Sequence, residues 1–337
     1  MILITGATGF LGHNLIPRLL QAGYQVRAVV RPSSDTRFLQ TLGVDLVVIP
    51  DITDRAALTQ ACTGCHSVIH AAGHFRFWDK FPTYWHTNVA GTQAILTAAT
   101  AAQVQRFVHI STLAVIGRPP ISGPIDEQTR CFPQDHYQRT KLEGESLALN
   151  FHRDQGLPVI VLRPGWFYGP WGRYAFNRLN FEEPLRGWRI KVDNGRHILC
   201  PVYINDVAQA TQLALTAGQP GHIYNISGHV LDQTHINAII SDLSGIGHWR
   251  INIPKPVVLN LARAWTLLAR FTGHEPFYPI TLAPYVFEDW RVSTAKAEAE
   301  LGFTPTPFIQ GAKETLDWYW GQGILGHHQP SKKKLSI

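Results

Sequence analysis

The chain has 337 residues, of which 45% are hydrophobic and 16% are charged, and this composition excludes a disordered or fibrous protein. Its formal net charge is +6, but the basic residues are spread along the chain and form no stripe of the kind that binds nucleic acid. No apolar run reaches the roughly eighteen residues of a transmembrane helix, and no basic segment precedes an apolar stretch at the N-terminus. We therefore expect a globular, cytoplasmic protein.

Short apolar runs alternate with segments of helical periodicity through the first half of the chain. The alternation predicts βαβ units, so we expect an α/β fold with a doubly wound parallel sheet covered by helices on both faces. The expected strands are residues 2–5, 25–30, 45–49, 67–71, 106–110 and 158–162, and the expected helices include 11–22, 54–62, 89–102 and 140–154.

The pattern changes after Pro164. Residues 166–197 are aperiodic, residues 198–217 again fit a strand and a helix, and prolines between positions 254 and 307 separate short helices and turns. We expect residues 1–165, joined by 198–217, to form the sheet domain. Residues 166–197 and 218–325 should form a smaller, interleaved and mostly helical substrate lobe, and 326–337 a flexible tail.

A glycine-rich loop follows the first expected strand and opens the first expected helix. Glycines let a backbone approach a pyrophosphate closely, and the helix N-terminus supplies free N–H groups, so this context predicts a dinucleotide-binding loop. A plain tight turn is the alternative. The segment is Thr5-Gly6-Ala7-Thr8-Gly9-Phe10-Leu11-Gly12. Its glycine spacing of three and three resembles that of the short-chain dehydrogenase/reductase superfamily, and the resemblance implies a Rossmann fold.

The end of the second expected strand bears on the choice of cofactor. NAD-binding folds usually place an Asp or Glu there, on the adenosine ribose, whereas this chain has Arg31 followed by Pro32, Ser33 and Ser34. A guanidinium beside two hydroxyls suits a 2′-phosphate, so we expect NADP to be preferred, with a solvated surface arginine as the alternative. Asp35 lies close enough to keep NAD possible.

Tyr137 and Lys141 stand four residues apart in a segment compatible with a helix, so both side chains face the same side. Such pairs are common on exposed helices, and this one gains weight from the glycine loop upstream. A tyrosine with its usual pKa near 10 is a poor base at neutral pH, and bringing that pKa to about 7 needs about 4 kcal/mol of preferential phenolate stabilisation. Lys141 and an oxidised nicotinamide can supply it.

The resemblance to extended members of this superfamily covers nearly the whole chain. Ser111-Thr112-Leu113-Ala114-Val115-Ile116-Gly117 resembles the pattern Ser-Thr-x-x-Val-Tyr-Gly, which places the catalytic hydroxyl on Thr112 in preference to Ser111 and puts Ile116 where the family has Tyr. Asn88 matches the family's catalytic asparagine, with a structural hydrogen bond as the alternative. Cofactor contacts are implied for Asp51, Ile52, Ala71, Ala72, Gly73, Pro164, Gly165 and Phe167.

On this resemblance, the implied reaction is reversible hydride transfer between a nicotinamide and a carbinol carbon. Tyr137 exchanges the alcohol proton, Lys141 tunes Tyr137, and Thr112 polarises the carbonyl. Aromatic residues are expected to line a broad apolar substrate pocket, with core or lid packing as the alternative. The expected substrate contacts, besides Thr112, are Phe75, Trp78, Trp166 and Tyr168.

The pattern is most similar to the branch that contains 3β-hydroxysteroid dehydrogenases, dihydroflavonol-type reductases and hopanoid-associated sugar epimerases. We therefore expect an NAD(P)-dependent oxidoreductase of a hydrophobic, steroid-, terpenoid- or flavonoid-like alcohol or ketone. A nucleotide-sugar epimerase or dehydratase that works by transient oxidation, and a non-catalytic NADP sensor, are the alternatives. No metal or nucleic-acid partner is expected, and a homodimer is possible. Residues 255–271 have an amphipathic pattern that fits packing on the core better than contact with a membrane surface.

Overall fold

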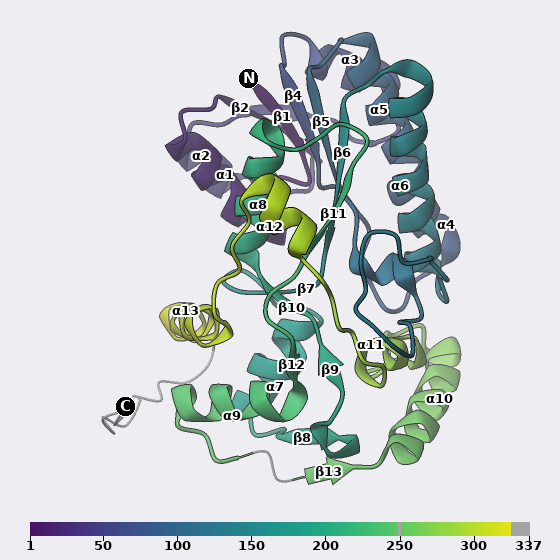
Figure 1. Ribbon diagram of the computed structural model, residues 1–337, viewed down its shortest axis with the longest axis vertical. Helices are drawn as coiled ribbons and strands as arrows, with labels where there is room; N and C mark the ends of the chain where they lie inside the picture. The colour runs from purple at the N-terminus through teal and green to yellow at the C-terminus, as the bar shows by residue number, and fades with distance from the viewer. Residues whose placement is uncertain (249–250, 325–337) are drawn as a thin grey trace.

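A parallel sheet organises the computed structural model, which describes residues 1–248 and 251–324 (Figure 1). Within that part of the chain it has seven strands in the order β11-β6-β5-β4-β1-β2-β3, so the chain order reverses between β1 and β4. The strands are β1 Ile2–Thr5, β2 Val26–Val30, β3 Asp45–Val48, β4 Ser67–His70, β5 Arg106–Ile110, β6 Val159–Pro164 and β11 Ile223–Ile226. The prediction of a doubly wound parallel sheet is confirmed.

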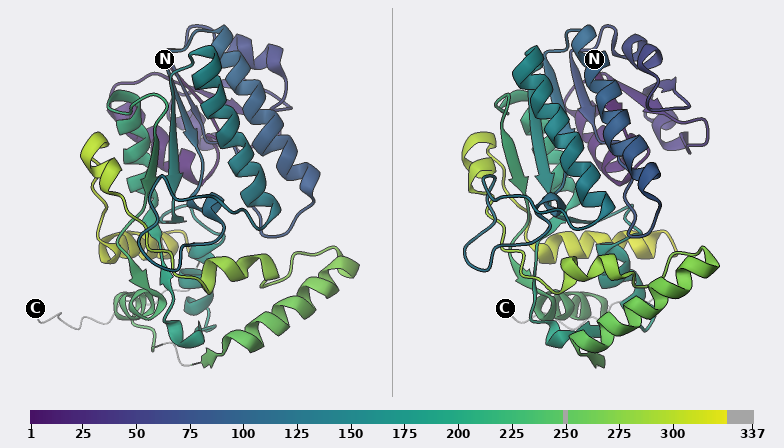
Figure 2. Two further views of the ribbon diagram at one scale, coloured as in Figure 1. Left: turned by 45° about the vertical axis from the view of Figure 1, so that its right-hand side comes forward. Right: turned by 90° about the vertical axis from the view of Figure 1, so that its right-hand side faces the viewer.

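Helices cover both faces of this sheet, as Figure 2 shows. On one face α1 (Phe10–Gln21) packs beside α8 (Ile204–Thr216), and on the other α3 (Arg55–Cys62), α5 (Thr92–Ala101) and α6 (His136–Gln155) pack side by side. Successive strand residues point to opposite faces, so Ile2 and Ile4 belong to the core under α1 and α8, and Leu3 belongs to the core under α3 and α5. Burial on both faces explains why the strands are nearly continuous apolar runs.

Helix α6 carries the predicted Tyr–Lys pair and begins four residues earlier than the sequence pattern indicates. Its N-cap is Asp135, whose carboxylate accepts a hydrogen bond of 2.7 Å from the Gln138 backbone N–H. It ends at Gly156, which adopts the left-handed conformation with φ of 72°. Tyr137 therefore lies in the first turn of a twenty-residue helix, at the carboxyl edge of the sheet.

A smaller lobe lies beyond this edge of the sheet (Figure 1). Three two-stranded pairs belong to the described part of the chain: β7 with β10, β9 with β12 and β8 with β13. Their bounds are Trp166–Tyr168 and Pro201–Tyr203, Ile198–Leu199 and Leu231–Asp232, and Ile190–Val192 and Ile251–Ile253. The helices after α8 are α9 Gln233–Ser244, α10 Lys255–Thr272, α11 Ala283–Val286, α12 Ala295–Leu301 and α13 Phe308–Gly321.

The remaining helical segments are short. They are α2 Arg37–Thr41, α4 Phe81–Trp85 and α7 Glu183–Leu185, the π-helical turns η1 His86–Gly91 and η3 Arg178–Glu182, and the 3₁₀ turns η2 Leu113–Ile116, η4 Asp193–Gly195 and η5 Ile280–Leu282. The helix expected over residues 89–102 is thus divided into η1 and α5. No helix of residues 1–248 and 251–324 is long and apolar enough to span a bilayer.

The boundary between sheet domain and lobe differs from the prediction in two places. Residues 218–325 were expected to belong to the lobe, but β11 is the edge strand of the main sheet and α12 packs against β11 and α8. Within residues 198–217, α8 covers the sheet as expected, whereas β10 pairs with β7 instead of joining the sheet. The predicted flexible tail, 326–337, lies outside the described residues.

Candidate active site

A single cavity of about 760 Å³ extends from the glycine loop, past α6, into the lobe. It lies at the carboxyl ends of β1 and β4, where the chain order of the sheet reverses. Open parallel sheets bind ligands at such a switch point, because the loops after the two strands diverge there. Gly6 and Gly9 line the cavity from one side, and Thr112, Tyr137 and Lys141 line it from the other.

The glycine loop fits a dinucleotide. Gly6 has φ of +77°, and a Cβ at this position would lie 2.6 Å from the backbone of Ala71, so the loop can pass close to β4 only as glycine. A Cβ on Gly12 would lie 2.0 Å from the Ala7 carbonyl oxygen, so glycine also allows α1 to begin against the loop. The N-cap of α1 is Gly9, which offers no side-chain cap, and the first turn contains no acidic residue. The helix N-terminus is therefore free to bind an anionic pyrophosphate.

Most of the predicted cofactor contacts lie along this cavity. Those that line it are Gly6, Gly9, Phe10, Leu11, Ala71, Gly73, Tyr137, Lys141, Gly165 and Phe167. Those that do not are Thr8, Gly12, Arg31, Asp51, Ile52, Ala72 and Pro164. The structure explains three of the latter group: Gly12 packs on Ala7, the Ala72 N–H donates to Thr5 Oγ1 at 3.2 Å, and Pro164 is buried in β6.

Arg31 and Asp51 follow β2 and β3, at the same edge of the sheet as the glycine loop, and both are exposed. Within the described residues, the Arg31 guanidinium makes no hydrogen bond or ion pair, so it can bind a ligand. Asp35, the predicted alternative for a ribose, accepts a hydrogen bond of 2.9 Å from Arg37 Nε. Asp51 Oδ1 accepts hydrogen bonds from the Thr53 hydroxyl at 2.8 Å and His86 Nε2 at 2.9 Å.

Lys141 is held in place by the backbone of the neighbouring strand. Its Nζ donates a 2.7 Å hydrogen bond to the Ile110 carbonyl oxygen at the end of β5, and only 6% of the residue is exposed. Burial lowers the pKa of Lys141 to about 8, and the Glu145 carboxylate opposes this shift. The ammonium charge at this position is therefore sensitive to small changes in its surroundings.

Tyr137 and Thr112 line the same cavity as Lys141, and their hydroxyl groups contact each other. Burial raises the pKa of the Tyr137 phenol above its ordinary value, and a hydrogen bond with the Thr112 hydroxyl opposes the shift. Thr112 Oγ1 also accepts a 3.2 Å hydrogen bond from the Ala114 N–H, which caps η2 and fixes the Thr112 side chain. Burial thus favours the protonated phenol, which is the state that a proton donor requires.

A buried ion pair beneath these residues was not anticipated from the sequence. Arg163 donates to the Glu145 carboxylate from Nε at 3.0 Å and from Nη2 at 2.5 Å, and both side chains are almost fully buried. The Ser111 hydroxyl donates to the same carboxylate at 2.6 Å, so Ser111 is engaged there while Thr112 remains in contact with Tyr137. Arg163 lies 18 residues after Glu145, on β6, so no local spacing in the sequence indicates the pair.

Asn88 does not line the cavity, although it was predicted to be catalytic. Its Oδ1 accepts a 2.7 Å hydrogen bond from the His74 N–H, and its Nδ2 donates to the His74 carbonyl at 3.2 Å and to Thr140 Oγ1 at 3.1 Å. The amide thus ties the loop after β4 to α6 and holds α6 in position. This is the structural role that was the alternative for Asn88.

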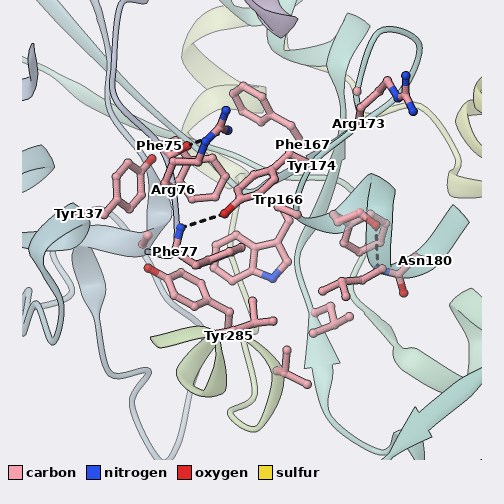
Figure 3. Close-up of a pocket in the computed structure, with 18 of the residues that line it drawn as sticks. Phe75, Arg76, Phe77, Tyr137, Trp166, Phe167, Arg173, Tyr174, Asn180 and Tyr285 are labelled. Atoms are coloured by element: carbon pink, nitrogen blue, oxygen red, sulfur yellow. Dashed lines mark hydrogen bonds between the residues drawn. The ribbon is translucent and has the colours of Figure 1, made fainter. Parts of the chain in front are cut away.

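Aromatic side chains surround Tyr137 on the lobe side, as Figure 3 shows. The Phe75 ring lies 4.8 Å from the Tyr137 ring and 5.2 Å from the Phe77 ring, measured between centroids. Trp166 packs edge-on against Tyr285 at 5.3 Å. The predicted substrate contacts Phe75 and Trp166 line the cavity together with Phe77. Tyr285 also lines it, and the sequence did not single out this residue.

Two other predicted substrate contacts lie outside the cavity. Tyr168 is 2% exposed, and its ring packs against Phe308 and Phe176 with centroid distances of 4.9 and 5.8 Å. Gly311 of α13 leaves room for this ring, since a Cβ there would lie 2.6 Å from the Tyr168 hydroxyl. Trp78 is half-buried and does not line the cavity. Tyr168 thus packs in the core, which is the alternative considered for these aromatic residues.

The outer part of the cavity is formed by segments that are distant in sequence. Several of its residues come from the loop before β8, from α10 and from the turn after α10: Trp188, Val258, Leu261, Trp265, Phe277 and Tyr278. The sequence showed an amphipathic helix over residues 255–271 but contained no sign that one part of it would face the Tyr–Lys pair. That arrangement depends on how the lobe packs against the sheet domain.

The fold and the site together define a class of enzyme: a Rossmann-type oxidoreductase of the extended short-chain dehydrogenase/reductase superfamily. The model of the NAD dependent epimerase/dehydratase family matches residues 2–227, and the chain belongs to this family. The Rossmann architecture and the enzyme class expected from the sequence are thereby confirmed.

Relatives of this chain include both reductases and epimerases. It is 29% identical to a putative dihydroflavonol 4-reductase of Synechocystis, over 96% of this chain and 95% of that protein. It is 28% identical to the 4-hydroxy-2-methyl-3-oxo-4-farnesyl-3,4-dihydroquinoline-1-oxide ketoreductase of Stigmatella aurantiaca, over 96% and 98%. A solved UDP-glucuronic acid 4-epimerase of Bacillus cereus, in complex with UDP-glucuronic acid and NAD, has a TM-score of 0.76 and 26% identity, over 95% and 99%.

Proposed function

We propose that the protein is an NAD(P)-dependent oxidoreductase that transfers hydride reversibly between the nicotinamide and a secondary alcohol or ketone of a hydrophobic, steroid-, terpenoid- or flavonoid-like substrate. The observation that carries the proposal is the cavity of about 760 Å³, in which Tyr137 lies among the rings of Phe75, Phe77 and Trp166. A large, mostly apolar cavity with few polar groups suits a large apolar ligand whose one reactive oxygen is held by those groups.

The proton chemistry belongs to three side chains of this protein. The nicotinamide, when bound, supplies or accepts the hydride. In the reducing direction Tyr137 donates its hydroxyl proton to the substrate oxygen, and in the oxidising direction it takes the proton back. The Thr112 hydroxyl holds the same oxygen, and the Lys141 ammonium stabilises the phenolate by its charge. The hydrogen bond from Lys141 to the Ile110 carbonyl keeps that charge at the end of β5.

NADP is the cofactor that the exposed cation at the end of β2 favours. Arg31 is exposed and free of partners within the described residues, whereas the carboxylate of Asp35 is engaged by Arg37. A 2′-phosphate can accept charge-assisted hydrogen bonds from Arg31. A ribose 2′-hydroxyl would instead need a free carboxylate, which Asp35 offers only by giving up its contact with Arg37.

A nucleotide-sugar epimerase or dehydratase is the second candidate, because one structural neighbour is an epimerase with a bound sugar nucleotide. A diphosphate in the cavity would need free cationic groups. The arginines that line the cavity are already engaged: Arg173 Nη2 donates to Glu182 at 2.9 Å, and the Arg76 guanidinium lies 4.8 Å from the centroid of the Tyr174 ring. These contacts favour the hydrophobic substrate.

The test is the absorbance of the reduced cofactor at 340 nm, followed with the purified protein over a panel of hydrophobic ketones, secondary alcohols and sugar nucleotides. We expect net consumption of NADPH with a hydrophobic ketone, and its formation from NADP with the matching alcohol. A constant absorbance throughout the panel, together with an epimerised or dehydrated sugar nucleotide, would refute the proposal in favour of the second candidate.

A further inference from the structure

Helix α10 is apolar on two adjoining faces, and only one of them is packed. Val258, Ala262 and Ala269 are buried against the lobe, where the first two share a cluster with Tyr278 and Tyr285. The outer stripe, defined as Val257, Leu261, Trp265, Leu268 and Phe271, recurs at steps of four, four, three and three residues, and each member is exposed. A water-exposed helix normally presents polar residues on its outer face. Packing on the core, the role expected for this segment, thus accounts for one face of α10 alone.

The outer stripe is a highly exposed apolar surface of the lobe. Phe271 is 83% exposed and Leu268 is 58% exposed, and Leu267 beside them is 55% exposed. α10 runs along the outer edge of the lobe, away from the sheet (Figures 1 and 2). Contiguous apolar surface of this kind marks a site of contact with another apolar surface.

The charge of α10 indicates which surface that is. Residues 255–272 contain three basic residues and no acidic residue. Arg263 is exposed and hydrogen-bonds only within the helix, to Asn260 Oδ1 at 3.2 Å, among the contacts of the described residues. Glu275, which follows α10, is engaged by the Tyr174 hydroxyl. A second copy of α10 would bring like charges together, whereas anionic lipid headgroups would complement them.

The outer stripe is also continuous with the mouth of the cavity. Leu261 and Trp265 belong to the stripe and line the cavity as well. Trp188 and Phe277 are likewise both exposed and cavity-lining, and the Trp265 and Phe277 rings are 6.4 Å apart. An apolar molecule dissolved in a bilayer would therefore meet apolar side chains from the outer stripe into the cavity.

We propose that α10 is an interfacial helix that lays its outer stripe on the surface of an anionic bilayer and opens the cavity toward the lipid. An amphipathic helix with aromatic and aliphatic residues on one face and cations on its polar face binds in this manner. Docking rests on the geometry of α10 alone, while delivery of a membrane-dissolved substrate to the cavity rests on the proposed function.

The experiment is cosedimentation of the whole protein with vesicles, without cofactor or substrate. Vesicles of phosphatidylcholine are compared with vesicles of phosphatidylcholine and phosphatidylglycerol. We expect binding to the anionic vesicles, weakened at high salt. Leu268→Asp and Phe271→Asp should each lower the partition coefficient at least about tenfold, and Arg263→Gln about fivefold. Neither Leu268 nor Phe271 lines the cavity, so reduction of a water-soluble ketone should be retained.

The matched control is Ile309→Asp, which places the same charge at a 50% exposed position of α13, on the other side of the lobe (Figure 1). It should bind vesicles like the unmodified protein. Thermal melting confirms that each variant is folded. Arg263→Gln, a polar change at an exposed site, tests the proposal without altering the apolar surface.

Three results would overturn the proposal. The first is absence of vesicle binding, and the second is vesicle binding that the α10 variants leave unaffected. The third is a dimer that the α10 variants dissociate, without any vesicle binding. Vesicle binding with no oxidoreductase activity would leave docking standing and refute the proposed function.

Discussion

Replacing Glu145 with Gln tests the buried ion pair beneath the catalytic residues. The carboxylate accepts hydrogen bonds of 2.5 and 3.0 Å from Arg163 and one of 2.6 Å from Ser111, and the Glu145 and Arg163 side chains are 2% and 4% exposed. Removing one partner leaves the Arg163 charge buried without compensation, which costs about 3–5 kcal/mol. Glu145→Gln should therefore lower the free energy of unfolding by that amount, measured by urea denaturation.

Two further variants show whether the loss of stability comes from the burial of the unpaired Arg163 charge. Asp317→Asn removes an exposed i to i+4 pair with Lys313, 2.8 Å long, and should change the free energy of unfolding by less than about 1 kcal/mol. Glu145→Gln combined with Arg163→Met removes the orphaned charge and should cost less than the sum of the two single changes. A loss below about 1 kcal/mol for Glu145→Gln, or additivity in the double variant, would refute the reasoning.

Three other predictions concern the cofactor and the catalytic lysine. Arg31→Ala should raise the KM for NADPH about ten- to hundredfold and leave that for NADH nearly unchanged, as steady-state kinetics with both cofactors would reveal. Gly6→Ala should abolish cofactor binding in fluorescence titration, because its Cβ would lie 2.6 Å from Ala71, whereas Gly23→Ala, at a similar φ of +83° in open space, should retain binding. The pKa of Lys141 is about 8 in the folded state and near 10.5 when unfolded, so the unfolded chain binds more protons at this residue between these values, and the contribution of Lys141 to stability rises with pH there. The buried thiols, whose pKa values are raised, act in the opposite direction in any variant. Urea titrations should therefore show the free energy of unfolding of the unmodified protein rising with pH relative to that of Lys141→Met.

The sheet and the inner site were predictable because their signals are local. Each strand from β1 to β6 is an apolar run bounded by turns, and the glycine loop follows β1 directly. Tyr137 and Lys141 meet because they lie one turn apart on α6. β11 was not recognised as a sheet strand, because its buried Asn225 interrupts the apolar run.

The substrate side of the site depends on contacts between distant segments. Tyr285 reaches Tyr137 through Gln138, whose Nε2 donates to the Tyr285 hydroxyl at 2.8 Å, across 147 positions of sequence. Tyr168 and Trp166 occupy the same short strand, but one lies in the core and the other in the cavity, according to what packs on each. Local pattern identifies such residues as apolar and leaves their surroundings undetermined.

The most direct test follows the hydride itself, with NADPH that carries deuterium at both hydrogen positions of nicotinamide C4 and a hydrophobic ketone from the panel. We predict deuterium on the carbinol carbon of the alcohol product. Tyr137→Phe should bind NADPH normally and slow this transfer by at least about a hundredfold. An alcohol without deuterium, or a Tyr137→Phe variant that transfers it at the unmodified rate, would contradict the claim that Tyr137 serves hydride transfer in this cavity.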